Sequence, residues 1–150
     1  MILRRAFLLL PAALAACAAP PPPPATLNLT LQGGPDQNPD ASGKPGTVAV
    51  RLFQLAAVGK FERADAFALI EREAATLGAD DLGSEEFVIG PGEKRLISRE
   101  LKKGVQVIGI GVWFRDIDNA KWRTTAAAPA TGTLNLMLKT AGTTSTLAPG

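Results

Sequence analysis

The residue types that most often carry out chemistry are scarce in this chain of 150 residues. It has no histidine and no tyrosine, and Cys17 is its only cysteine. Histidine is the commonest general base and the commonest metal ligand, so either kind of site would need other residues. The serines lie in no nucleophile-elbow motif, and the Gly-Ile-Gly run at 109–111 lies inside a strand pattern rather than at the strand-to-helix turn of a dinucleotide site.

Carboxylates are the remaining catalytic candidates. Asp36, Asn38 and Asp40 alternate as the first ligands of a calcium loop do. Position six of such a loop should be glycine and position twelve glutamate, but Ala41 and Thr47 stand there. Asp and Asn also cap turns by hydrogen bonding to nearby backbone, and the spacing favours this interpretation. We therefore expect no enzyme activity, no metal site and no cofactor.

Cys17 follows a segment that is typical of a bacterial lipoprotein signal. Residues 1–16 begin with a short basic stretch, continue through an apolar run and end in small residues. The apolar run is too short for a membrane-spanning helix, which needs roughly 20 apolar residues. Leu14, Ala15 and Ala16 before Cys17 resemble a lipobox, whose cysteine becomes the first residue of the mature chain. We therefore expect residues 1–16 to be removed and Cys17 to carry a diacylglycerol and an N-acyl chain.

Acyl chains on Cys17 would hold the mature protein on a membrane that it does not cross. Each buried CH₂ contributes about 0.8 kcal/mol, and two or three chains make a permanent anchor. Ala18 stands where an aspartate would retain a lipoprotein at the inner membrane of enteric bacteria. We thus expect the periplasmic face of the outer membrane. The prolines within 17–25 favour a polyproline II spacer, with a disordered tail as the alternative.

Removal of the signal also changes the charge of the chain. The full sequence has 16 Lys and Arg against 14 Asp and Glu, which gives a net charge of +2. Arg4 and Arg5 leave with the signal, so 14 residues of each sign remain. A neutral chain lacks the basic surface of a nucleic-acid-binding protein, so we expect no such partner. Residues 26–150 are enough for one domain with its own core, held without a disulfide.

Hydrophobic periodicity predicts a mainly-β domain. Strict alternation predicts strands at 26–32 and 48–55, joined by a connection at 33–46 that is rich in Gly, Pro and Asp. Further strand patterns lie at 87–89, 94–101, 105–114, 122–127 and 133–139, with 143–147 as an optional addition. Because helices do not alternate with these short strands, the pattern predicts a two-sheet antiparallel β-sandwich of about eight strands.

Residues 61–78 have the period of a helix, with Phe67, Ile70, Ala74 and Leu77 on one face. This segment is the one helical insertion that we expect in the sandwich. In the apolar strand that begins at 105, the glycines at 109 and 111 would admit a close neighbour such as this helix.

Trp113, Trp122 and Arg123 allow two interpretations. An exposed tryptophan beside an arginine would suit an interface hot spot. Alternating strand positions instead favour tryptophans packed in the core, with Arg123 at the edge of a sheet.

The chain as a whole resembles the TssJ (SciN, VasD) outer-membrane lipoproteins of the type VI secretion system. Besides the lipobox, the matching segments are Asn38-Pro39-Asp40, Gly43-Lys44-Pro45, Arg51–Leu55, Phe61, Ala64-Asp65, Leu69, Leu77-Gly78, Asp80–Leu82, Pro91–Glu93, Ile108-Gly109, Phe114–Asp116, Ala120 and Trp122-Arg123. Phe53 departs from the pattern, because the family often has tyrosine there.

The resemblance implies a fold, a partner and a site. The fold would be a transthyretin-like β-sandwich with a helical addition. The protein would anchor the secretion apparatus to the outer membrane by binding the periplasmic domain of TssM, an IcmF-like inner-membrane protein. The family's contact loop corresponds to 33–46, where we choose Gln37, Asn38, Asp40 and Lys44 as the partner-binding residues. A solvated loop that contributes no binding energy is the alternative.

Two other function classes stay open at this stage. A lipoprotein that binds a small periplasmic ligand would need a deep apolar pocket between the sheets. A hydrolase would need a pair of carboxylates facing one another in a cleft. We expect neither a small-molecule substrate nor such a pair.

Overall fold

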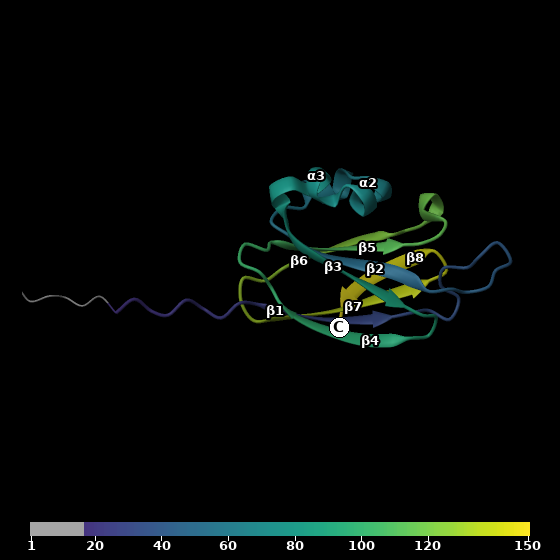
Figure 1. Cartoon of the computed structure of the whole chain (residues 1–150). Helices are drawn as coiled ribbons and strands as arrows, with labels where there is room; N and C mark the ends of the chain where they lie inside the picture. The colour runs from purple at the N-terminus through teal and green to yellow at the C-terminus, as the bar shows by residue number, and fades with distance from the viewer. Residues whose placement is uncertain (1–16) are drawn as a thin grey trace, which may run out of the picture.

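Two four-stranded sheets pack face to face in the computed structural model of the chain, which describes residues 17–150 (Figure 1). The strand orders are β4-β1-β7-β8 and β3-β2-β5-β6. The strands are β1 Thr26–Gln32, β2 Val48–Leu55, β3 Asp81–Ile89, β4 Lys94–Glu100, β5 Val107–Trp113, β6 Arg123–Ala127, β7 Thr133–Ala141 and β8 Thr144–Pro149. The predicted mainly-β sandwich is confirmed.

One strand pairing differs from the predicted antiparallel arrangement. β1 runs antiparallel to β4 but parallel to β7, so that Leu29 lies opposite Ile97 on one side and Leu136 on the other. The other pairings between these strands are antiparallel. Alternation along a strand shows which side chains face the core but not the direction of its neighbours, which is why the sequence did not predict this pair.

Apolar side chains from both sheets fill the space between them. The alternating residues of β1 and β2 are at most 2% exposed: Leu27, Leu29, Leu31, Val48, Val50 and Leu52. Ile108, Ile110 and Val112 of β5, which lies beside β2 in the same sheet, belong to this core too. Each such side chain contributes roughly 1.5–3 kcal/mol by leaving water, so this layer holds the sandwich together.

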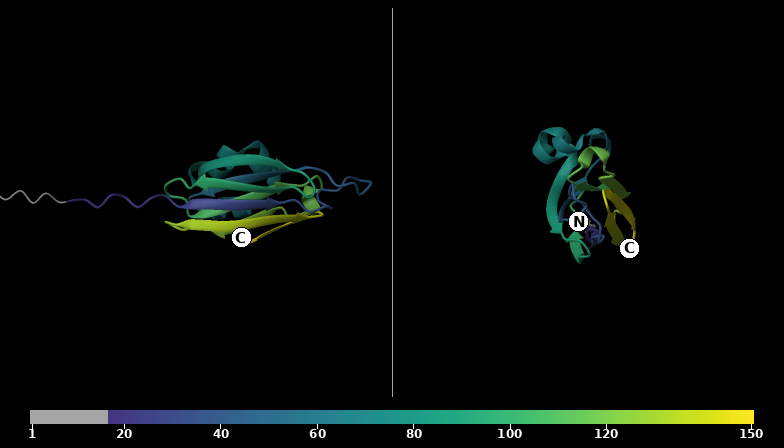
Figure 2. Two further views of the ribbon diagram at one scale, coloured as in Figure 1. Left: turned by 90° about the horizontal axis from the view of Figure 1, so that it is seen from below. Right: turned by 90° about the vertical axis from the view of Figure 1, so that its right-hand side faces the viewer.

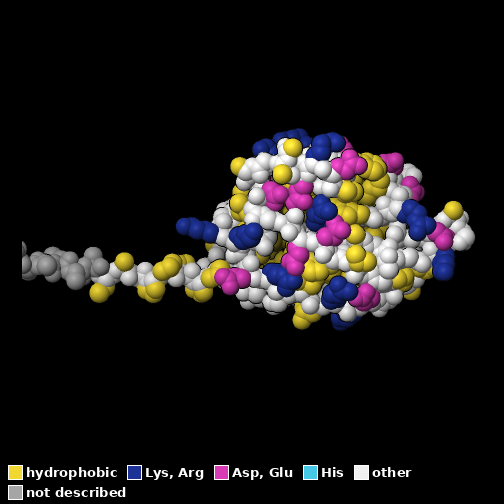
Figure 3. Space-filling view, viewed as in Figure 1, with side chains coloured by type: hydrophobic (Ala, Val, Ile, Leu, Met, Phe, Trp, Pro, Cys, Tyr) yellow, Lys and Arg dark blue, Asp and Glu magenta, His cyan; other side chains and the backbone are white. Residues whose placement is uncertain are grey.

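The predicted helix at 61–78 is three short helices: α1 Gly59–Arg63, α2 Ala66–Glu71 and α3 Glu73–Leu77. They lie over the outer face of the β3-β2-β5-β6 sheet and lead through a 3₁₀ turn, η1 Gly78–Asp80, into β3 (Figures 1 and 2). Because a continuous helix is absent, the predicted apolar face is partly wrong. Phe67 and Ile70 are 53% and 37% exposed, and hydrophobic side chains gather on the surface beside α2 (Figure 3).

A second core lies between the helices and the outer face of this sheet. It consists of fully buried Phe53, Leu55, Phe61, Leu69 and Leu77. The rings of Phe53 and Phe61 lie 5.1 Å apart. A Cβ atom on Gly109 would lie 3.0 Å from the Phe61 ring, so the predicted close approach of the helical segment to this strand glycine is confirmed.

Arg123 ties the helical segment to the edge of the sheet. Its Nη1 donates to the carbonyl oxygen of Phe61 at 2.7 Å and to that of Glu62, and its Nη2 donates to the carbonyl oxygen of Ala64. The guanidinium lies 4.2 Å from the centre of the Trp122 ring. Burial lowers the pKa of Arg123 from its usual value.

The two tryptophans pack together in the same region, as the favoured interpretation predicted. Trp113 and Trp122 are half-buried, with ring centres 5.5 Å apart, and both pack against the second core. Arg51 adds a second tie to the helices by donating to the Leu69 carbonyl oxygen at 3.1 Å and pairing with Glu73 at 3.2 Å.

Phe61→Ala should strongly destabilise the domain because it empties the centre of the second core. We expect the free energy of unfolding to fall by about 3–5 kcal/mol, the usual cost of truncating a buried phenylalanine. Phe67→Ala is the matched control and should change it by less than about 0.5 kcal/mol, since that ring is half exposed. Urea unfolding followed by tryptophan fluorescence measures both. Similar losses for the two variants would contradict the second core.

Candidate functional site

The tether and the loop between β1 and β2 leave opposite ends of the sandwich (Figure 1). Residues 17–24 are exposed and extend away from the start of β1, with Cys17 near their far end. The loop at 33–46 projects beyond the strands at the other end, as the view from below also shows (Figure 2). A membrane held through Cys17 and a partner held at the loop would therefore lie on opposite sides of the domain.

The predicted signal and the lipobox residues Leu14, Ala15 and Ala16 lie outside the described residues. The acylation of Cys17 stays a prediction. Across residues 17–150, no helix has the length and apolar character that a bilayer crossing requires.

A tight turn around Asp40 forms the exposed tip of the loop. Residues 41–45 are exposed, and the Asp40 and Lys44 backbones join through a hydrogen bond of 2.9 Å. Asp40 Oδ1 accepts from the Ser42 hydroxyl at 2.6 Å and from the amides of Ser42 and Lys44 at 2.9 Å each. These hydrogen bonds, chiefly that from the Ser42 hydroxyl, lower the pKa of Asp40 from its usual value. Asp40 therefore stabilises the turn at the tip through contacts within the loop itself.

This arrangement predicts a pH dependence at the tip. The pKa of Asp40 is lower in the folded loop than in the unfolded chain, where it is about 3.9. The Asp40 carboxylate therefore stabilises the turn fully at pH values above the unfolded pKa. This stabilisation is lost as the pH falls through the lower pKa of the folded loop. Amide chemical shifts of Ser42 and Lys44, followed by NMR, should titrate together below an ordinary aspartate pKa. Titration at or above the ordinary value would contradict this role.

Gln37 does not face solvent in this structure, and its role as a partner contact stays a prediction. The residue is fully buried. Its Nε2 donates to the carbonyl oxygens of Ile89 at 2.9 Å and Gly46 at 3.1 Å, while its Oε1 accepts from the Thr140 hydroxyl at 2.6 Å. Every hydrogen-bonding group of this amide is directed into the protein, so a partner cannot reach it without displacing the loop.

Asn38 is likewise held by contacts within the protein, and its predicted contact with a partner also stays a prediction. It is 7% exposed and has a φ of 47°, in the left-handed region that asparagine tolerates better than most residues. Its Nδ2 donates to the Thr47 carbonyl oxygen at 2.7 Å, and its Oδ1 accepts from the Arg115 amide at 2.7 Å. Its own amide donates to the Gly142 carbonyl oxygen at 2.8 Å.

Of the four predicted contact residues, Asp40 and Lys44 remain at the surface, with Lys44 the more exposed. The structure adds Arg115, an exposed residue whose positive charge also acts to lower the pKa of Asp40. Basic and acidic side chains project where the loop lies (Figure 3). Sequence reasoning missed Arg115 and Thr140, because each joins the loop across more than 70 residues and no local pattern marks either one.

The carboxylates at 36 and 40 do not form a metal site with Asn38, whose side-chain oxygen is already bonded to the Arg115 amide. Within residues 17–150, no group of three or more potential ligands among Asp, Glu and Cys lies close enough to hold a metal ion.

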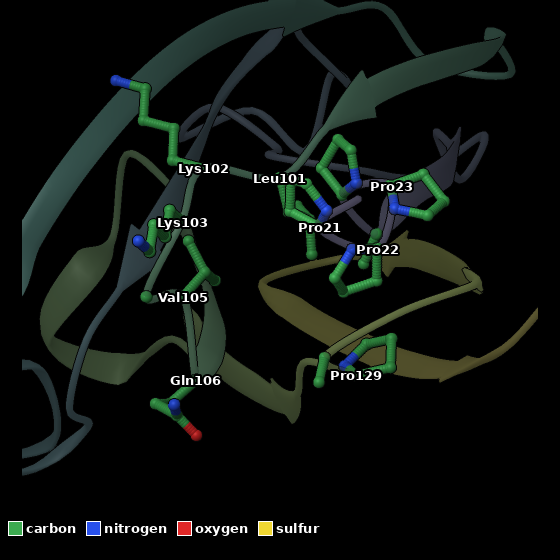
Figure 4. Close-up of a pocket in the computed structure, with 13 residues that line it drawn as sticks. Pro21, Pro22, Pro23, Leu101, Lys102, Lys103, Val105, Gln106 and Pro129 are labelled. Carbon is green, nitrogen blue, oxygen red and sulfur yellow. The ribbon is translucent and has the colours of Figure 1, made fainter. Parts of the chain in front are cut away.

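Two hollows bear on the ligand-binding alternative. The larger, about 510 Å³, lies at the tether end between Pro21–Pro24, Leu101–Gln106 and Pro129-Ala130 (Figure 4). The smaller, about 290 Å³, lies where the edges of β3 and β4 face one another, and the ion pair of Arg99 and Glu85, at 2.6 Å, lines it. The first is formed partly by the tether itself, and the second is charged, so neither is the deep apolar pocket that this alternative requires.

Comparison with known proteins places the chain in a family. Residues 25–143 match the family model described as type VI secretion lipoprotein, VasD, EvfM, TssJ. The chain belongs to this family of type VI secretion lipoproteins. The family resemblance predicted from the sequence is therefore confirmed.

Solved structures of type VI secretion proteins resemble the chain throughout its sandwich. The type VI secretion lipoprotein TssJ1 from Pseudomonas aeruginosa is 32% identical, with a TM-score of 0.82 over 85% of this chain and 98% of that one. A chain in the structure of a type VI membrane complex is 26% identical, with a TM-score of 0.72 over 83% and 98%. A chain in a structure described as the TssM C-terminal domain from EAEC is 25% identical, with a TM-score of 0.69 over 83% and 98%. No curated protein matched.

The part of the chain that matches the family model includes the loop at 33–46 and begins at Ala25. The matched portion thus contains β1 to β7 and the loop, whereas β8 lies after it. Cys17 and the tether lie before that portion, and their role rests on the sequence pattern.

Proposed function

We propose that this type VI secretion lipoprotein links the outer membrane to the periplasmic domain of TssM. Acyl chains on Cys17 hold the tether end at the periplasmic face of the membrane, and the tip of the loop at 33–46 binds TssM. The observation that carries this proposal is the placement of an ordered, exposed loop tip at the end of the sandwich opposite the tether (Figure 1).

In this proposal, three successive segments of the chain have different roles. Residues 1–16 serve as the signal, 17–25 as the acylated tether and 26–150 as the sandwich. An extended tether has a rise of about 3.1 Å per residue, so it would lift the domain on the order of 25–30 Å from the lipid. The protein has a structural task in this account, with no reaction of its own, no small-molecule substrate and no nucleic-acid partner.

The loop tip suits a partner interface because its shape is fixed before binding. Asp40 already holds the turn through three hydrogen bonds. A preformed loop avoids most of the ordering cost that a flexible loop would have on binding. Charged groups at the rim, Lys44 and Arg115 among them, would align a partner of complementary charge.

A binding measurement with matched charge reversals tests the proposal. The full acylated chain, purified in detergent micelles, is titrated with the periplasmic domain of TssM from the same organism. We expect saturable binding with a micromolar or lower Kd, weakened about 10-fold by Lys44→Glu, a loss of about 1.4 kcal/mol. Lys103→Glu, an equally exposed change at the tether end, should leave the Kd unchanged. The absence of saturable binding, or equal effects of the two reversals, would refute the proposal.

A further inference from the structure

One buried network joins the connections at the loop end of the sandwich. The Gln37 side chain links the end of β3, through the Ile89 carbonyl oxygen, to the far side of its own loop at Gly46. The Thr140 hydroxyl donates to Gln37 and accepts from the Gly34 amide at 3.0 Å. Both side chains are buried, Gln37 fully and Thr140 to 3% exposure, so their hydrogen bonds are shielded from water.

The start of the loop is also held by direct contact between backbones. A Cβ atom on Gly33 would lie 2.3 Å from the Gly90 carbonyl oxygen, and one on Gly34 would lie 2.2 Å from the Thr140 carbonyl oxygen. Only glycine fits where two backbones approach so closely. The Gly33 amide also donates to the Glu93 carbonyl oxygen at 2.8 Å. The loop is therefore fastened to β7 and to the β3–β4 turn before its chain reaches the tip.

Besides the contacts of Asn38 and of the two glycines, two sets of side-chain contacts act on different parts of the loop. Those of Asp40 lie within the tip and fix the shape of the turn. Those of Gln37 and Thr140 lie below the tip and fix where the turn stands on the sandwich. Without the second set, the turn would still form, but fewer contacts would fix the position of the loop on the sandwich.

We propose that Gln37 and Thr140 are positioning residues for partner binding: they hold the loop at 33–46 where TssM binds it, although neither touches the partner. This inference rests on the proposed function and adds to it the residues that set its affinity. If the correctly placed loop is populated only a fraction of the time, the apparent Kd rises by the inverse of that fraction. A buried hydrogen-bond network is a suitable means of keeping that fraction near one.

The decisive variant is Thr140→Val, which keeps the side-chain volume and removes the hydroxyl that joins Gly34 to Gln37. Gln37→Ala is the companion variant, and Gln54→Ala is the matched control, because Gln54 accepts from the Lys102 amide at 2.8 Å near the tether end. Each full-length protein in micelles is titrated with the TssM periplasmic domain. We expect the Kd to rise about 10-fold for the first two, as it would if the competent fraction fell to about a tenth, and less than 2-fold for Gln54→Ala.

Two further readouts separate positioning from a general loss of stability. The first readout is amide hydrogen exchange in Thr140→Val. The amide of Asn38, which donates to the Gly142 carbonyl oxygen, and that of Gly46, which donates to the Gln37 carbonyl oxygen, should exchange faster. The hydrogen bonds from the Ser42 and Lys44 amides to Asp40 should persist. In a double-mutant cycle with Lys44→Glu, the two losses of binding free energy should add, because the competent fraction multiplies the apparent Kd whatever the strength of the contact at the tip. A clear departure from additivity would overturn the inference.

The outcomes distinguish this inference from the function on which it rests. If the unaltered chain does not bind TssM, the proposed function fails and the inference falls with it. If the unaltered chain binds and Lys44→Glu weakens binding, but folded Thr140→Val binds as tightly as the unaltered protein, only the inference is refuted. Should Gln37→Ala not fold, Thr140→Val decides the question.

Discussion

Cys17→Ser should release the protein from the membrane into the soluble periplasmic fraction and stop type VI secretion. The hydroxyl cannot take the diacylglyceryl group, and the rest of the described chain has no helix that could span a bilayer. Since two or three acyl chains hold a protein almost permanently, their loss should move nearly all of it to the soluble fraction. Fractionation followed by immunoblotting measures the distribution, and a killing assay against competitor cells measures secretion.

Ala18→Ser is the control for this experiment because it changes the neighbouring residue and keeps the thiol. It should leave both the distribution and secretion unchanged. Sedimentation of the Cys17→Ser protein with membranes would show that something other than the acyl chains holds it there.

Replacing the loop tip, residues 41–45, by Gly and Ser residues in equal number should weaken TssM binding by more than about 100-fold. A few interface residues usually carry most of the binding energy, and this change removes every exposed side chain of the tip at once. The fold should survive, because Gln37, Asn38 and the strands are untouched. Titration with the periplasmic domain of TssM measures the affinity, and urea unfolding measures the stability.

The matched control replaces the five residues 128–132, which connect β6 to β7 at the tether end, by Gly and Ser. Its affinity for TssM should equal that of the unaltered protein. Full binding by the tip variant would place the interface elsewhere on the sandwich.

Local patterns in the sequence predicted those parts of the fold that depend on neighbouring residues. Alternating leucines at 27, 29 and 31 identified β1 and its buried face, and Gly109 marked the strand against which the helical segment packs. The parallel pairing of β1 with β7 could not be predicted, because it joins strands that are more than 100 residues apart. The break at Arg72, whose φ and ψ of −135° and 43° are not helical, likewise has no signal as strong as proline or glycine.

In the candidate site, too, contacts between near neighbours were predicted and contacts between distant residues were not. Asp40 was predicted to cap a turn, and it does so through residues two and four positions away. Gln37 and Asn38 were expected at the surface because polar residues in a Gly- and Pro-rich connection are usually solvated. Their partners lie on Thr140 and Arg115, far along the chain, so only the folded structure shows that these amides are buried and satisfied.

The separation of the tether from the loop suggests how the protein would transmit a force between the membrane and TssM. Force from the membrane would enter at Cys17 and leave at the loop tip, and it would pass along strands whose core is filled from both sheets. The network of Gln37 and Thr140 lies where the loop joins those strands, so it would keep the tip in place while the tether moves.

Recruitment to vesicles tests the central claim most directly. The acylated protein is incorporated into phospholipid vesicles, the soluble periplasmic domain of TssM is added, and the vesicles are separated by flotation. The account predicts that TssM floats with vesicles carrying the unaltered protein and stays behind with the Cys17→Ser protein or with the tip variant. TssM that floats equally well with the tip variant, or that never floats with the unaltered protein, would contradict the claim that this lipoprotein links a membrane to TssM through its loop.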